Sequence, residues 1–200
     1  MNKRQQQKMA TRAKLVSTAR ELFAAQGFLN TTTAQIAKSS GVAHGTLFVH
    51  FATREHLMVE VLDREMEALS DRLGRQMAVA GGFFDLLERY LDFLTEHEGF
   101  FSSLWRELPL YPDELRRKVM FRYAGIQTHF HRALSASVSA GEVPPCDANL
   151  VVQTLFAQLH YYLSLRTLFV EDGSVVARFR GRLRTLARLL TACGDDGEGA

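Results

Sequence analysis

Cysteine is scarce in this sequence, since Cys146 and Cys193 are the only two among 200 residues. A disulfide framework or a structural zinc site needs about four clustered ligands, so we interpret both as free thiols of a reducing compartment. Long apolar runs are also missing: none approaches the roughly 18 residues that span a bilayer. The basic start, MNKRQQQKMATRAK, lacks the apolar centre of a signal peptide. We therefore expect a cytoplasmic protein without a membrane partner.

Acidic residues are sparse at the N-terminal end. Residues 1–60 contain eight Lys or Arg but only three Asp or Glu, a net charge of +5, whereas the other 140 residues carry −3. A basic N-terminal segment on a mildly acidic remainder indicates that this segment meets a polyanion.

Helical periodicity runs through the whole sequence, and strand alternation and internal repeats are absent. Apolar residues recur at intervals of three and four, as on one buried face of a helix. The predicted helices are 8–26, 33–40, 45–50, 54–76, 83–96, 99–108, 112–140, 147–170 and 174–193. The sequence thus predicts an all-α fold of about nine helices, with a disordered tail over 194–200.

Residues that start and stop helices support the first four of these segments. Thr32 followed three residues later by Gln35 fits a capping box, and Thr53 can cap the fourth helix. Gly27 is well placed to end the first helix in a left-handed conformation, and Gly41 to end the second.

The stretch GVAHGTLFVHF, residues 41–51, places a very short helix after a glycine turn. Two short helices joined by a three-to-four-residue turn with glycine form a helix-turn-helix, whose second helix enters the DNA major groove. Leu47 and Phe51 would then anchor the back of this helix, while small residues at Ala43 and Gly45 allow close approach to phosphates.

The segment TTTAQIAKSSGVAHGTLFVHFATREHL resembles the DNA-binding domain of the TetR/AcrR family of bacterial transcriptional regulators. The resemblance covers about residues 10–60, with the turn glycine, the apolar anchors and the capped fourth helix in register. It implies a three-helix DNA-binding domain over 1–54 and a helical ligand-binding and dimerisation domain over 55–193.

The resemblance also implies roles for individual residues. Phosphate contacts would come from Thr33, His50 and Arg54, and base-edge or groove contacts from Ala43, His44, Gly45, Thr46 and Val49. Phe48 stands where the family usually has tyrosine, so one phosphate-binding hydroxyl is missing, and Ala43 replaces the usual serine.

Family likeness further implies a homodimer formed by the last two long helices, 147–170 and 174–193. Two DNA-reading helices about one DNA turn apart would bind an inverted repeat. A ligand that changes their separation would release the DNA, as a repressor requires.

The aromatic-rich remainder suits a small apolar or aromatic effector. For its contacts we single out Trp105, Tyr123 and His160.

Other function classes remain open at this point. An enzyme is not expected, because the sequence shows no phosphate-cradling glycine loop, nucleophile elbow or His-x-x-x-His pair. A heme- or metal-binding helical bundle would use His129, His131, His160 or Cys146 as ligands. A DNA-binding protein without any small-molecule effector is the third possibility.

Overall fold

The computed structural model describes residues 2–77 and 81–192, and all regular elements in these two ranges are helical. The all-α fold class is therefore confirmed. The elements are α1 (Lys3–Gln26), α2 (Thr33–Ser39), α3 (His44–His50), α4 (Arg54–Met77), α5 (Phe83–Glu96), α6 (Glu98–Glu107), the 3-10 helix η1 (Leu108–Leu110), α7 (Asp113–Ser139), α8 (Ala148–Ser164), α9 (Arg166–Phe169) and α10 (Val175–Ala192).

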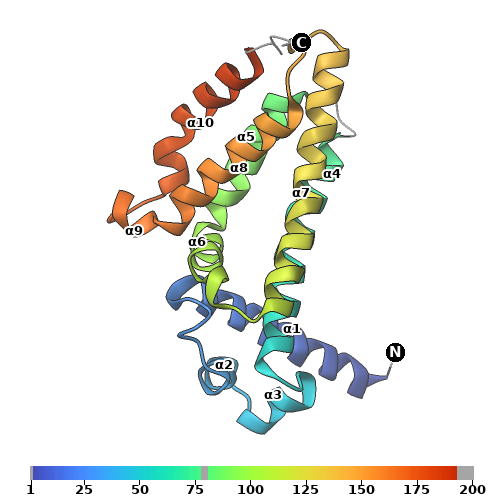
Figure 1. Cartoon of the computed structure of the whole chain (residues 1–200). Coiled ribbons are helices and arrows are strands. Elements are labelled where there is room, and N and C mark those ends of the chain that lie inside the picture. Colours follow the sequence, from blue (N-terminus) through green and yellow to red (C-terminus); the bar gives the residue numbers. More distant parts are fainter. Residues whose placement is uncertain (1, 78–80, 193–200) are drawn as a thin grey trace.

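The helices form a small head and a longer body (Figure 1). Helices α1, α2 and α3 make the head, and α5, α7, α8 and α10 run along the body. Helix α4 starts in the head and continues along α7. Of the helices in the described ranges, none combines the length and apolar character that a bilayer-spanning segment needs.

Head and body share one continuous hydrophobic core. Phe28, which follows α1, stacks on Phe23 with ring centroids 4.4 Å apart and meets the edge of Phe100 in α6 at 5.2 Å. Helices α1 and α6 cross closely because Gly99 has no side chain: a Cβ there would lie 2.9 Å from the carbonyl oxygen of Ala24. The head is thus packed directly against the body.

The first helix starts five residues earlier than its apolar positions predict. It begins at Lys3, where the side chain of Asn2 accepts a hydrogen bond from the Arg4 amide at 3.3 Å. Glutamine, lysine and arginine favour helix without needing a buried face, so an apolar pattern misses these turns.

The predicted helix over 147–170 is wrong as a single element, because α8 ends at Ser164 and α9 follows. The hydroxyl of Ser102 donates to the Leu163 carbonyl at 2.8 Å, and this carbonyl would otherwise accept from a later amide of the same helix. Arg166 binds Glu98 at 2.8 Å. Among the described residues the chain therefore has ten α-helices and one 3-10 helix.

Several predicted caps are found. The capping box of Thr32 and Gln35 is complete, and Thr53 accepts a hydrogen bond from the His56 amide at 3.2 Å. Gly27 has φ 88° as expected, but its ψ of 161° is extended rather than left-handed helical. The predicted tail over 194–200 and Cys193 lie outside the described residues.

Candidate nucleic-acid interface

The two short head helices are held in a fixed turn. Gly41 adopts φ 65° between them, and the Val42 amide donates to the Ala37 carbonyl at 3.1 Å. At the start of α2 and α3, the His44 ring nitrogen Nε2 lies 3.0 Å from the Thr33 hydroxyl. This hydrogen bond places two predicted DNA-contacting side chains next to each other.

Helix α3 has a buried back and an open front. Leu47 and Phe51 are buried in the core, as predicted. On the opposite side Phe48 is 45% exposed and Val49 is 71% exposed, which is unusual for such large apolar side chains. Ala43, His44 and Gly45 are exposed too, and a Cβ on Gly45 would meet nothing within 4 Å. The front of α3 is therefore free to enter a groove.

His50, the last residue of α3, is less available than its neighbours. Its carbonyl accepts a hydrogen bond from Arg12 Nη1 at 2.6 Å, and its Nδ1 is buried without a partner among the described residues. Burial, together with the charges of Lys8 and Arg12, lowers the pKa of His50. A neutral His50 can contact a phosphate only by a hydrogen bond, not by an ion pair.

Arg54 has a structural role that the sequence did not reveal. Its Nε donates to the Thr31 carbonyl at 3.1 Å and its Nη2 donates to the Phe28 carbonyl, so the guanidinium holds the loop between α1 and α2. Its predicted phosphate contact remains a prediction. These bonds indicate that Arg54 also orients α2, because the loop leads directly into that helix.

Glu107, at the end of α6, binds the same loop from the body. This side chain is buried, and its Oε2 accepts a hydrogen bond from the Leu29 amide at 2.8 Å. Its Oε1 accepts from Arg106 at 3.1 Å. Arg54 from α4 thus binds the carbonyls of Phe28 and Thr31, and Glu107 from α6 binds the amide of Leu29 between them.

Residues 15–61 match the sequence profile described as "Bacterial regulatory proteins, tetR family". This part of the chain belongs to the TetR family. The matched residues contain all of α2 and α3 and the parts of α1 and α4 that pack around them, as the resemblance implied.

Named relatives agree with this assignment. The HTH-type transcriptional regulator QacR of Staphylococcus aureus is 40% identical over 57 residues, 28% of this chain and 30% of that protein. UidR of Escherichia coli strain K12, also an HTH-type transcriptional regulator, is 30% identical over 100 residues, 50% of each protein. The match thus spans no more than half the length of either relative.

A solved structure extends the likeness in fold to the body. The transcriptional regulator FadR from Bacillus subtilis, in complex with stearoyl-CoA, superposes with a TM-score of 0.74. The comparison covers 90% of this chain and 98% of that chain at 19% sequence identity. The likeness in fold therefore includes the long body helices.

The three predicted effector contacts lie together in the body. Trp105 in α6 is 3.8 Å from the ring of His160 in α8 and 5.0 Å from that of Tyr123 in α7, between centroids. The Tyr123 hydroxyl and His160 Nε2 are buried and have no hydrogen-bond partner within the described part of the chain. Burial lowers the pKa of His160 to about 4, so its ring is neutral at pH 7.

Acid should weaken the fold through His160. Its folded pKa of about 4 lies below the usual 6.5, so the unfolded chain binds more protons between these values, and stability falls as pH drops through that window. This pKa difference contributes about 3 kcal/mol to the free energy of unfolding at pH 7. We expect urea unfolding to show a smaller loss from pH 7 to pH 4 for His160→Gln than for wild type. His131→Gln, at a half-buried α7 histidine, is the control; equal losses in all three chains would contradict the assignment.

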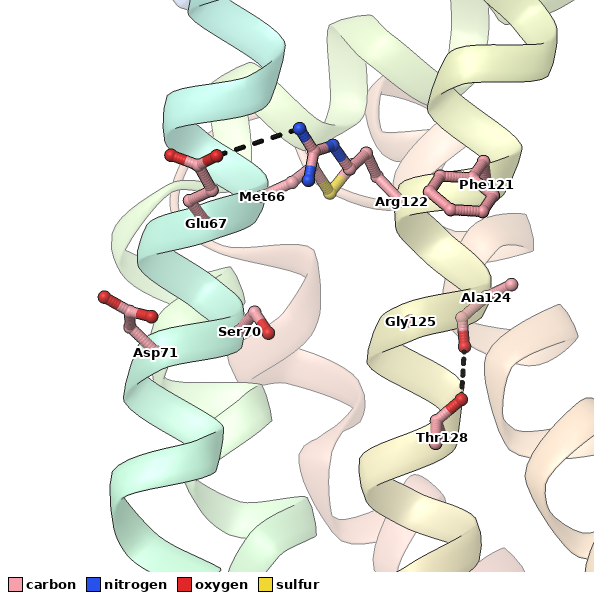
Figure 2. A pocket seen from close by; sticks show the side chains of 9 residues that line it. All are labelled: Met66, Glu67, Ser70, Asp71, Phe121, Arg122, Ala124, Gly125 and Thr128. Carbon is pink, nitrogen blue, oxygen red and sulfur yellow. Dashed lines mark hydrogen bonds and ion pairs between the residues drawn. The ribbon is translucent and has the colours of Figure 1, made fainter.

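A groove of about 420 Å³ lies between α4 and α7, away from the head (Figure 2). Gly125 on α7 lies opposite Ser70 on α4 in Figure 2. The groove has free space beside Gly125, because a Cβ there would meet nothing within 4 Å. Arg122 closes one end by binding Asp63 at 2.8 Å and Glu67 at 3.7 Å. The groove is lined by Met66, Glu67, Ser70, Asp71, Phe121, Arg122, Ala124, Gly125 and Thr128. None of the predicted effector contacts lines it.

The alternative of a metal site with three or more protein ligands receives no support from the described residues. Within residues 2–77 and 81–192, no three His, Cys, Asp or Glu side chains gather as metal ligands would. His129 binds the Ser70 hydroxyl at 3.1 Å through Nε2, whereas His160 packs among aromatic rings. No three of the candidate ligands named from the sequence therefore converge.

Proposed function

We propose that this chain is a sequence-specific DNA-binding regulator of transcription, with α3 as its DNA-reading helix. The observation that carries the proposal is the open front of α3, where Phe48 and Val49 are exposed on a helix whose back is fully buried. In the free protein Phe48 meets only the edge of the His44 ring among aromatic side chains, at 5.2 Å between centroids. Thymine methyl groups in the major groove would offer Phe48 and Val49 further apolar contacts.

Within this proposal, His44, Gly45, Thr46, Phe48 and Val49 face base edges or the groove wall. Thr33 and His50 flank these residues and contact phosphates. Arg54 holds the loop that leads into α2 and so orients that helix. The relatives that match are named as transcriptional regulators, which favours this function over an enzymatic one.

The protein acts as a homodimer in this proposal, formed by α8 and α10. These helices pack on each other within one chain and leave large apolar side chains exposed nearby. The exposed residues are Leu150, Tyr161, Leu165, Leu168 and Leu189. A second copy would cover them and hold two DNA-reading helices at a fixed separation, so the preferred site is an inverted repeat.

An effector would enter at the cluster of Trp105, Tyr123 and His160. The two unpartnered polar atoms there are both uncharged, and burial raises the pKa of Tyr123. A small, largely apolar molecule with one hydrogen-bonding group satisfies them without a charged partner. Such binding would separate α6 from α7 and α8 and, through Glu107, move the head and release the DNA, as a repressor requires.

Selection of genomic DNA fragments by the purified protein, followed by footprinting, tests this proposal. Enrichment of an inverted repeat is the expected result. Fragments with no shared sequence would overturn the proposed sequence-specific function and leave a nonspecific DNA binder.

His44→Ala should change which bases the protein prefers rather than only weaken binding. His44 is exposed at the N-terminal end of α3, where side chains contact base edges, and a lost base contact costs about 1–3 kcal/mol at one position. Repeating the selection with this variant, and with His131→Ala in the body as control, measures the change. The same base preferences in all three proteins would show that His44 does not read sequence.

A further inference from the structure

The first turns of α1 extend beyond the core without packing against it. We call residues 3–10 the outer arm. All of them are exposed, and the first buried side chain of the helix is Leu15. Figure 1 shows this end of α1 running past α3 to the edge of the head. Burial therefore does not explain why the chain continues as a helix there.

The outer arm lies on the same side of the head as the end of α3. Arg4, Lys8 and Arg12 are spaced by four residues and so follow one another along one helix face. Arg12 contacts the end of α3 directly: it donates to the His50 carbonyl at 2.6 Å and stacks over the Phe51 ring at 4.2 Å. Lys8 is close enough for its charge to lower the pKa of His50. Arg4 and Lys8 thus continue the surface of α3 outward.

The charge of the arm is uncompensated. The sequence has no acidic residue before Glu21. Lys3, Arg4 and Lys8 form no ion pair with any residue in the described ranges, whereas Arg12 is bound to Glu60. Three like charges on an exposed helical segment repel one another, and a bound polyanion would relieve this repulsion.

We propose that the outer arm binds DNA phosphates just outside the half-site that α3 reads. This inference rests on the proposed function and adds a sequence-independent contact to it. Lys3 lies nine positions before Arg12, so the arm reaches about 14 Å beyond the end of α3. At about 3.4 Å per base pair this corresponds to roughly four flanking base pairs on each side of the site. The positive N-terminal end of the helix further favours phosphate.

The test compares Arg4→Gln/Lys8→Gln with wild type on the selected operator. A matched control, Arg117→Gln/Arg132→Gln, removes the same charge from exposed positions in the body. Each arm loses two basic side chains, so a dimer loses four phosphate contacts. The slope of log affinity against log salt should therefore become less negative by about 3 to 4. The control should keep the wild-type slope, and thermal unfolding should be unchanged in both variants.

A second measurement varies the DNA rather than the protein. Wild type should bind an operator with ten flanking base pairs on each side more tightly than one cut at the outer edge of each half-site. The arm variant should bind both equally. If wild type prefers the operator over random DNA but neither flank length nor the arm variant alters its affinity, the arm proposal is wrong and the proposed function stands. If wild type shows no preference for any sequence, the proposed function fails, and the arm proposal with it.

Discussion

Gly27→Ala should lower the free energy of unfolding by about 3 kcal/mol or more. The backbone of Gly27 has φ 88° and ψ 161°, a combination that essentially only glycine adopts and that costs other residues about 1–3 kcal/mol. A Cβ at this position would also overlap the Glu107 carboxylate, which overpacks a buried contact at a further cost of about 1–3 kcal/mol.

Urea unfolding of Gly27→Ala, of Glu107→Ala and of the double variant separates the two costs. In the Glu107→Ala background the added methyl group no longer meets a carboxylate, so Gly27→Ala should cost less there than in wild type. Gly141→Ala is the control, since Gly141 has φ 74° and a Cβ there would meet nothing within 4 Å, and a loss of about 1 kcal/mol is expected. A loss at Gly27 no larger than at Gly141 would contradict the predicted overlap.

Val49→Glu should reduce operator affinity by about a hundredfold or more without unfolding the protein. Val49 is 71% exposed on the front of α3, so a polar side chain disturbs no core contact. In the proposed complex, each of the two DNA-reading helices would carry a carboxylate into a groove between phosphates. A mismatch at one contact costs about 1–3 kcal/mol, and a dimer has two.

Fluorescence anisotropy with labelled operator DNA measures this loss, and thermal unfolding verifies the fold. Phe121→Glu is the matched control, because Phe121 is 78% exposed in α7 and lies away from the head. If Val49→Glu binds like Phe121→Glu, α3 does not enter the groove.

Much of the head was predictable because its signals are local in sequence. The capping box of Thr32 and Gln35, the hydroxyl cap of Thr53 and the positive φ of Gly41 each depend on residues within three or four positions. The division of α3 into a buried back and an open front follows from helical spacing. The position of the helix-turn-helix could therefore be predicted from the amino-acid order alone.

Features that depend on distant residues were not predictable. Glu98 is buried in α6, yet it accepts hydrogen bonds from the amides of Val175 and Val176, more than 70 positions later, and so caps α10. The break after α8 likewise depends on Ser102, and the loop before α2 on Glu107. No periodicity in the sequence reports such pairings, because each requires the folded arrangement of two helices.

The close crossing of α1 and α6 limits how this protein can be recombined with its relatives. A Cβ on Gly99 would lie too close to the backbone of Ala24, and a Cβ on Gly27 would lie too close to the carboxylate of Glu107. Both pairs join a residue of the head to a residue of the body. A hybrid regulator that joins this body to another head at Arg54 would separate both pairs. Grafting a new DNA specificity onto this body is therefore better done by exchanging the front of α3 alone than by exchanging the whole head.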